Sequence, residues 1–140
     1  MAVRYLLDTN ICIYIAKHNP QCVRARFERH QASELAMSSI TLGELRFGAE
    51  QSKVRERSLI ALHHLESLIQ AMPLDQQAAN HYGQIRAELK RQGQIIGGND
   101  LWIAAHARSQ GWTLVTNNIR EFERVSGLKV ENWVEQPVAQ

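Results

Sequence analysis

The sequence predicts one α/β domain in which helices cover both faces of a central, mostly parallel sheet. Short apolar runs of the strand type alternate along the chain with segments of helical periodicity. No Asn-Gly dipeptide marks a tight hairpin between two of these strands. Strands that are separated by helices usually run parallel in one sheet, so the pattern favours a three-layer α/β/α arrangement.

Strands and helices are expected to take turns along the chain. Strands are expected over residues 3–7, 35–38, 71–74, 112–115 and 128–130, and helices over residues 10–17, 21–30, 41–51, 53–69, 76–91 and 101–110. Pro73 predicts that the third strand lies at an edge, because proline cannot donate a ladder hydrogen bond. Thr41 is expected to cap its helix, with Glu44 at the capping-box spacing. Gly93 and Gly111 are expected beyond the ends of the two later helices.

Length and composition indicate one globular unit. A chain of 140 residues with 44% hydrophobic and 21% charged residues is expected to form a single domain over residues 1–134, followed by a tail at 135–140. Cys12 and Cys22 show no metal-binding or CxxC spacing, so we expect reduced, buried thiols and a cytoplasmic protein. No apolar run reaches the length of a membrane span.

Acidic and polar residues follow the predicted strands or open the helices. Asp8 ends the first strand, Glu44 follows the second, and Glu121 follows the strand at 112–115, while Asp100 lies at a helix start. In a parallel sheet such segments emerge at one edge. Carboxylates that gather without lysine or arginine raise one another's pKa unless a cation lies among them. Mg²⁺ or Mn²⁺ would suit oxygen ligands, and such a site can hydrolyse a phosphodiester.

Each of these acids also has a structural explanation, which the local sequence leaves open. Asp8 is well placed to cap the helix that follows it. Asp100 could complement the dipole at its helix N-terminus. Glu44 could be an exposed helix acid, and Glu121 lies in a charged segment where a surface salt bridge is the ordinary expectation.

Four segments resemble the PIN-domain ribonucleases, and specifically the VapC toxins of bacterial type II toxin–antitoxin systems. In chain order they read LLDTN, TLGELRFGAE, YGQIRAELKRQGQIIGGNDLWIAAHA and LVTNNIREFERVSGLKVENW. The resemblance spans nearly the whole chain and implies a PIN-like fold. It also implies an Mg²⁺- or Mn²⁺-dependent endoribonuclease in which Asp8, Glu44 and Asp100 are catalytic acids, with Asp8 and Asp100 as the principal metal ligands.

The resemblance is incomplete at the fourth acid of the family. The stretch at 116–118 reads TNN, where many relatives have an aspartate. Glu121, one turn further on, is therefore expected to supply the fourth catalytic acid. Thr116 and Asn117 are expected to hold a water or a substrate phosphate by hydrogen bonds.

The resemblance further implies a toxin that cleaves initiator tRNA in its anticodon stem-loop. Arg86 and Lys90, four residues apart and so on one helix face, are our choice of RNA contacts. A homodimer is implied, as is a VapB-type antitoxin whose C-terminal segment covers the active site and whose N-terminal domain binds operator DNA. The toxin itself would contact no operator DNA and no membrane.

Two alternatives remain from the sequence. A phospho-aspartate enzyme would need an acid two residues after Asp8, where the chain has Asn10, or a lysine after a late strand, where it has TNN at 116–118. A catalytically degenerate PIN-like scaffold that acts through protein partners would explain the missing aspartate near Asn117. The other three acids argue against that scaffold, because a metal site depends on its ligand charges.

Overall fold

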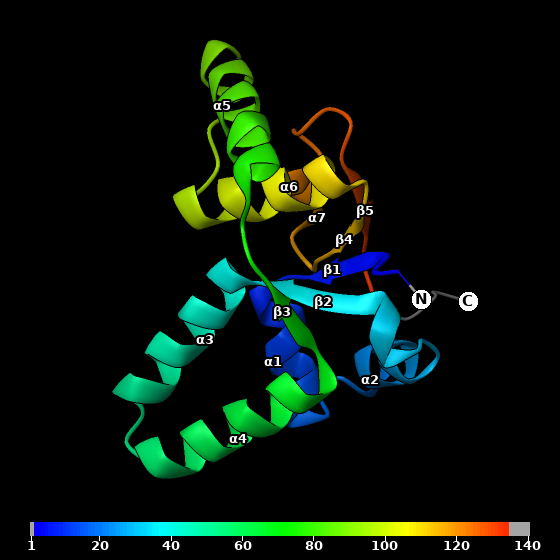
Figure 1. The fold of residues 1–140 in the computed structure, drawn as a ribbon, viewed down its shortest axis with the longest axis vertical. Helices are drawn as coiled ribbons and strands as arrows, with labels where there is room; N and C mark the ends of the chain where they lie inside the picture. The colour runs from blue at the N-terminus through cyan, green and yellow to red at the C-terminus, as the bar shows by residue number, and fades with distance from the viewer. Residues whose placement is uncertain (1, 135–140) are drawn as a thin grey trace, which may run out of the picture.

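A five-stranded sheet forms the centre of the computed structural model, which describes residues 2–134 (Figure 1). The strands are β1 (Tyr5–Leu7), β2 (Leu35–Ser38), β3 (Gln70–Met72), β4 (Thr113–Val115) and β5 (Lys129–Glu131). They lie in the order β3-β2-β1-β4-β5, and every neighbouring pair is parallel. The predicted parallel α/β fold is therefore confirmed, whereas the predicted tail at 135–140 lies outside the described residues.

Helices cover both faces of this sheet. They are α1 (Thr9–Lys17), α2 (Gln21–Glu28), α3 (Ser39–Gln51), α4 (Arg55–Leu68), α5 (Gln76–Arg91), α6 (Gly98–Gln110) and the short α7 (Ile119–Phe122), with a 3₁₀ turn, η1, at Ala32–Glu34. Figure 1 shows α1 to α4 below the sheet and α5 to α7 above it. Successive strand residues point to opposite faces. Leu6 accordingly packs in the core beneath α5 and α6, and Leu7 packs in the core beneath α1 and α2.

The start of α3 differs from the sequence prediction. The helix begins at Ser39, and the Ser38 hydroxyl at the end of β2 accepts a hydrogen bond from the Ile40 backbone N–H at 3.2 Å. Thr41 is buried inside the first turn, so the predicted capping box of Thr41 with Glu44 was wrong. Ser38 prevails because it places a hydroxyl directly where the strand ends.

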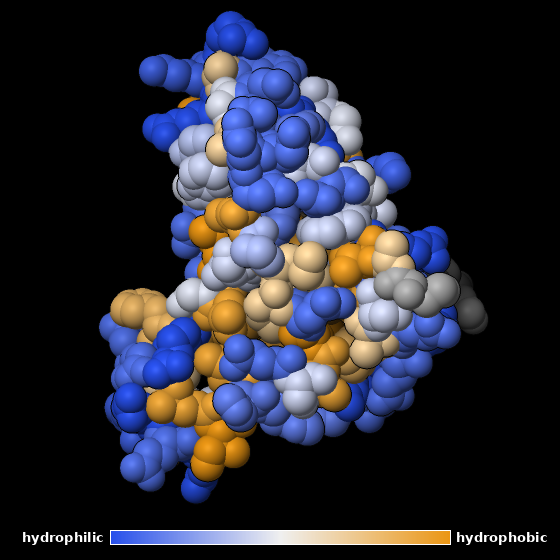
Figure 2. Space-filling view, in the orientation of Figure 1, coloured by the Kyte–Doolittle hydropathy of each residue, from blue (hydrophilic) through white to orange (hydrophobic). Residues whose placement is uncertain are grey.

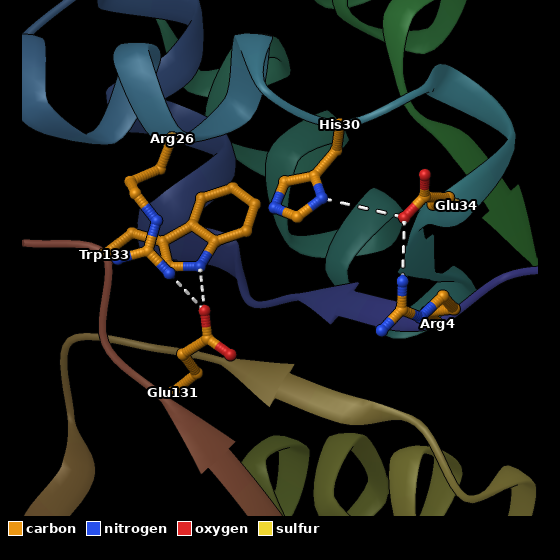
Figure 3. Close-up of polar contacts among 6 residues, drawn as sticks. All are labelled: Arg4, Arg26, His30, Glu34, Glu131 and Trp133. Carbon is orange, nitrogen blue, oxygen red and sulfur yellow. Dashed lines mark hydrogen bonds and ion pairs between the residues drawn. The ribbon is translucent and has the colours of Figure 1, made fainter.

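The segment after β5 folds back against α2 and the start of β1 (Figure 3). Trp133 is fully buried, and its indole N–H donates to the Glu131 carboxylate at 2.9 Å. Arg26 of α2 pairs with the same carboxylate oxygen. The Trp133 ring stacks on His30, with centroids 5.3 Å apart, and lies 6.1 Å from the Tyr5 ring. These contacts fix the end of β5 to residues more than a hundred positions away.

The edge strand, the cysteines and the helix lengths bear on three further sequence predictions. The strand order confirms that β3 is an edge strand, but the strand ends at Met72, so the prediction that it includes Pro73 was wrong. The cysteines are free, Cys12 being fully buried and Cys22 half-buried, and burial raises the pKa of the Cys12 thiol. Across residues 2–134, every helix falls short of the length and apolarity that a membrane crossing requires.

Candidate active site

Asp8 lies where β1 ends and α1 begins, and its side chain is only 7% exposed. Its Oδ1 accepts a hydrogen bond from the Ile11 backbone N–H at 3.0 Å, so the predicted helix cap is confirmed. Burial raises the pKa of Asp8 to about 6, and the neighbouring Asp100 and Glu44 carboxylates add to the rise. Hydrogen bonds from Thr116 and from the Ile11 backbone oppose it. Asp8 is thus a cap that also faces two other carboxylates.

Thr116 reaches Asp8 because β1 and β4 are adjacent parallel strands. Leu7 pairs with Val115, and the Asp8 backbone N–H donates to the Val115 carbonyl at 3.0 Å. Thr116 is fully buried, its hydroxyl accepts from the Asn118 backbone N–H at 2.9 Å, and its side chain lies near enough to Asp8 to lower the pKa of that carboxyl. The structure therefore places Thr116 beside Asp8.

Glu44 is held from the start of α1. The Thr9 hydroxyl donates to Glu44 Oε1 at 2.6 Å, and the Thr41 hydroxyl oxygen lies 3.3 Å from that of Thr9. Glu44 is half-buried on α3, so its carboxylate is oriented while one side remains open to solvent. Glu44, for which the local sequence also allowed the role of an exposed helix acid, is thereby hydrogen-bonded to the segment that carries Asp8.

Asp100 lies in the first turn of α6 and is half-buried. Burial raises the pKa of Asp100, and the carboxylates of Glu121 and Glu44 raise it further. Asn117 is exposed, and its side-chain oxygen accepts from the Asn132 amide at 3.4 Å. Of the two residues considered for the fourth position, Glu121 is the one whose charge acts on Asp100.

The four acids form no ion pair in the part of the chain that is described. No lysine, arginine or histidine within residues 2–134 forms an ion pair with Asp8, Glu44, Asp100 or Glu121. The surface salt bridge considered for Glu121 is therefore not found there. Within the same residues, no three acidic, histidine or cysteine side chains lie close enough together to hold a metal ion. The acids interact electrostatically without forming a closed ligand set.

Two hollows flank Glu44. The first, here called the polar hollow, has a volume of about 660 Å³, and its lining includes Thr9, Ser39, Gly43, Glu44, Phe47 and Asn99. The second, the apolar hollow, has a volume of about 400 Å³ between α1, α3 and α4, and its lining includes Ile13, Leu45, Ala61, Leu62 and Leu65. Thr9 and Glu44 line both. Figure 2 shows hydrophobic side chains at the surface in the lower part of the molecule, where α3 and α4 lie.

The predicted RNA contacts on α5 lie elsewhere. Arg86 and Lys90 are exposed, and neither lines the polar or the apolar hollow. The Arg86 guanidinium donates to the Tyr82 hydroxyl at 2.7 Å, and the Tyr82 ring stacks on Trp102 with centroids 3.8 Å apart. The structure thus brings together the predicted acids but not these two cations. Phe47, one helical turn after Glu44 on α3, lines the polar hollow and was not among the residues that the sequence singled out.

The fold and these acids define a PIN-domain protein. The PIN domain family model matches residues 5–128, and the chain belongs to that family. It is 50% identical over 131 residues to the tRNA(fMet)-specific endonuclease VapC of Shigella flexneri, covering 94% of this chain and 98% of the relative. It is 47% identical to Ribonuclease VapC2 of Haemophilus influenzae, covering 94% and 99%. Within the PIN family, the chain belongs to the VapC ribonucleases.

Solved structures agree with this placement. DNA-bound VapBC from Salmonella typhimurium matches with a TM-score of 0.88 and 46% identity, over 94% of this chain and 98% of the other. VapBC2 from Rickettsia felis, bound to a DNA fragment from its promoter, matches with a TM-score of 0.87 and 40% identity, over 94% and 99%. The predicted PIN-like fold and the resemblance to VapC are both confirmed.

Proposed function

We propose that this chain is the toxin of a VapBC toxin–antitoxin system and that it hydrolyses a phosphodiester bond of RNA. The observation that carries the proposal is the proximity of acids from separate elements: the charges of Asp100 and Glu44 raise the pKa of Asp8, and the charges of Glu121 and Glu44 raise the pKa of Asp100. Glu44 also lines the polar hollow, which is large enough for a nucleotide, since ligand sites commonly measure about 300 to 1,000 Å³.

We propose Asp8 and Asp100 as the ligands of one Mg²⁺ or Mn²⁺ ion. Both carboxyls have a raised pKa and no cationic partner within the described residues, so a divalent cation would relieve their repulsion. Mg²⁺ often binds through one or two carboxylates, with waters and substrate phosphates completing its coordination, so two protein ligands suffice. When bound, such an ion activates a water and stabilises charge on the phosphate.

The remaining polar residues would orient these groups. Thr116 and the Ile11 backbone N–H hold the Asp8 carboxylate, and Thr9 holds Glu44 at the rim of the polar hollow. Glu44 is then placed to accept a hydrogen bond from a water beside the phosphate. Glu121 adds negative charge next to Asp100, which strengthens the attraction for a cation.

We further propose initiator tRNA as the substrate, cut in the anticodon stem-loop, because a close relative is named for tRNA(fMet) cleavage. The partner would be a VapB-type antitoxin, with operator DNA bound only through the complex, as the DNA-bound relatives indicate for their own systems. We also propose that the chain forms a homodimer. It would act in the cytoplasm, where thiols are reduced and tRNA occurs. The apolar hollow suits a segment of the antitoxin, since it adjoins Glu44.

The test is cleavage of labelled initiator tRNA by the purified full chain with Mg²⁺. Asp8→Asn and Asp100→Asn should each lower the rate by roughly a hundredfold or more, because each removes a ligand charge. Asp75→Asn is the matched control: Asp75 also caps a helix, accepting from the Ala78 backbone N–H at 3.0 Å, but lies outside the acidic cluster. Excess chelator should abolish cleavage.

Three outcomes would contradict the proposal. Equal rates for wild type and the Asp8 and Asp100 variants would exclude these acids as metal ligands. Full activity in excess chelator would exclude a divalent ion. A folded wild-type chain that binds antitoxin but cleaves no RNA with either metal would favour the degenerate scaffold instead. A melting curve separates metal binding from turnover, since Mn²⁺ should raise the Tm of wild type and not that of Asp8→Asn.

A further inference from the structure

Phe47 is a large aromatic residue that lies at the surface next to polar residues. Its side chain is 62% exposed on α3 and lines the polar hollow. Thr9, Ser39 and Asn99 line the same hollow, together with the apolar Ile40. Isolated apolar residues on a surface are common and carry no meaning by themselves. Phe47 differs from such residues because it lies beside Glu44, a proposed catalytic acid.

The helix fixes the relation between Phe47 and Glu44. Residues three apart on a helix lie on one face, about one turn from each other. The Phe47 ring therefore stands next to the Glu44 carboxylate along the wall of the same hollow. A group bound against the ring would therefore lie beside Glu44.

We propose that Phe47 stacks on a nucleobase of the RNA beside the scissile phosphate and so positions the strand for cleavage. Proteins recognise unpaired RNA by stacking splayed bases on aromatic rings and by hydrogen bonds to base edges. Asn99 and Ser39 supply such hydrogen-bonding groups around the ring. This inference rests on the proposed ribonuclease function and adds a substrate contact to it.

The lining favours RNA over a protein segment at this position. The apolar hollow on the other side of Glu44 is walled by Leu45, Leu62 and Leu65, which suit apolar side chains of a protein. The polar hollow instead combines Phe47 and Ile40 with four polar residues, Thr9, Ser39, Glu44 and Asn99. Base stacking needs only a π-face and accepts any base, so one exposed ring among polar groups is sufficient.

Gly43 offers an independent way to test access to this hollow. A Cβ added at Gly43 would meet no atom within 4 Å, and the residue lines the polar hollow. Leucine at this position would fill the space in front of the Phe47 ring. The fold should tolerate the change, because leucine favours the helix interior more than glycine does.

The experiment measures KM and kcat for the tRNA substrate with the full chain. Phe47→Ala should raise KM by about tenfold, the loss expected for one stacked base, with a much smaller effect on kcat. Phe47→Tyr should restore the KM of wild type and Phe47→Leu should not, because only tyrosine keeps an aromatic face. Gly43→Leu should raise KM to a similar extent without lowering the Tm. Ile60→Ala is the control, since Ile60 is 71% exposed on α4 and lies outside the polar hollow.

A binding readout separates stacking from turnover. RNA that carries 2-aminopurine beside the cleavage site should lose fluorescence on binding to Asp8→Asn protein, and the added change Phe47→Ala should abolish that loss. A wild-type KM for Phe47→Ala or for Gly43→Leu would overturn the inference. A wild-type KM for Phe47→Leu would also overturn it. The same holds if sedimentation runs show that Phe47→Ala impairs only self-association or antitoxin binding. Absence of cleavage by wild type would instead contradict the proposed function itself.

Discussion

The Thr9 hydroxyl donates a hydrogen bond of 2.6 Å to the Glu44 carboxylate, which joins the start of α1 to α3. The two residues are 35 positions apart in sequence. Thr9 follows directly after Asp8, so the same segment carries one acid and orients another. A shift of α3 relative to β1 would therefore move Glu44 away from Asp8.

Thr9→Val should lower RNA cleavage by about tenfold or more, because a hydrogen bond to a charged group contributes roughly 1.5 to 3 kcal/mol. Valine keeps the shape of threonine and removes only the hydroxyl. The measurement is single-turnover cleavage together with a thermal melt. Thr113→Val, the same change at the start of β4, is the control and should cleave like wild type. A loss of fold stability large enough to explain the lost rate would refute an orienting role for Thr9.

Asp8→Asn should stabilise the metal-free protein at neutral pH. Burial and the Asp100 and Glu44 carboxylates raise the pKa of Asp8 from 3.8 to about 6 in the folded state. A raised carboxyl pKa means that the contribution of Asp8 to stability is greatest below pH 3.8 and is lost as the pH rises through about 6. Asparagine keeps the helix cap and removes the charge.

The expected gain in the free energy of unfolding is on the order of 2 to 3 kcal/mol near neutral pH. This gain should become smaller as the pH falls toward about 4. Urea titrations in the presence of chelator would measure it at both ends of this range. When the titrations are repeated with Mn²⁺, wild type should be more stable than Asp8→Asn, because only wild type then gains a bound ion. A variant that is less stable than wild type at neutral pH without metal would show that burial does not penalise the Asp8 charge.

Glu121→Gln should lower cleavage by roughly tenfold to a hundredfold, as is usual when a group that supports a metal ligand is removed. Its charge acts on Asp100, whereas the Asn117 side chain accepts from Asn132 on the outside of the molecule. Asn117→Ala should therefore cleave at nearly the wild-type rate. If instead Asn117→Ala cleaves slowly and Glu121→Gln cleaves normally, Asn117 and not Glu121 occupies the position of the family's fourth acid.

Trp133→Phe should lower the free energy of unfolding by about 2 kcal/mol, through the lost hydrogen bond to Glu131 and the smaller buried ring. Cleavage and Mn²⁺ affinity measured on the folded variant should be unchanged. Chemical denaturation provides the measurement, with Trp112→Phe as the matched change at a half-buried tryptophan. Reduced metal affinity in a fully folded Trp133 variant would show that this cluster influences the active site.

The order of strands and helices could be predicted because periodicity and caps are local properties of a sequence. The α5 helix was predicted at its observed bounds, residues 76–91. The start of α3 could not be predicted correctly, since Ser38 and Thr41 both offer hydroxyls and only the end of β2 decides between them. The contact of Trp133 with Tyr5 was also out of reach, because it depends on how the sheet closes.

For the site, the sequence identified the acids but not their relations. Asp8 could be read as a cap or as a ligand, and the structure shows that the cap coexists with neighbouring carboxylates. The choice between Glu121 and Asn117 required the path of the chain after β4. Arg86 and Lys90 shared a helix face as predicted, yet that face lies away from both hollows. Spacing along one helix cannot show what the helix faces.

The wall that the two hollows share makes the Glu44 carboxylate reachable from an apolar cavity. A small-molecule inhibitor could fill the cavity with a hydrocarbon body and place a cationic tip against Glu44. Such a compound would need no phosphate and no base. Its selectivity would come from the mainly apolar side chains of α1, α3 and α4, and not from the acids that we propose as catalytic.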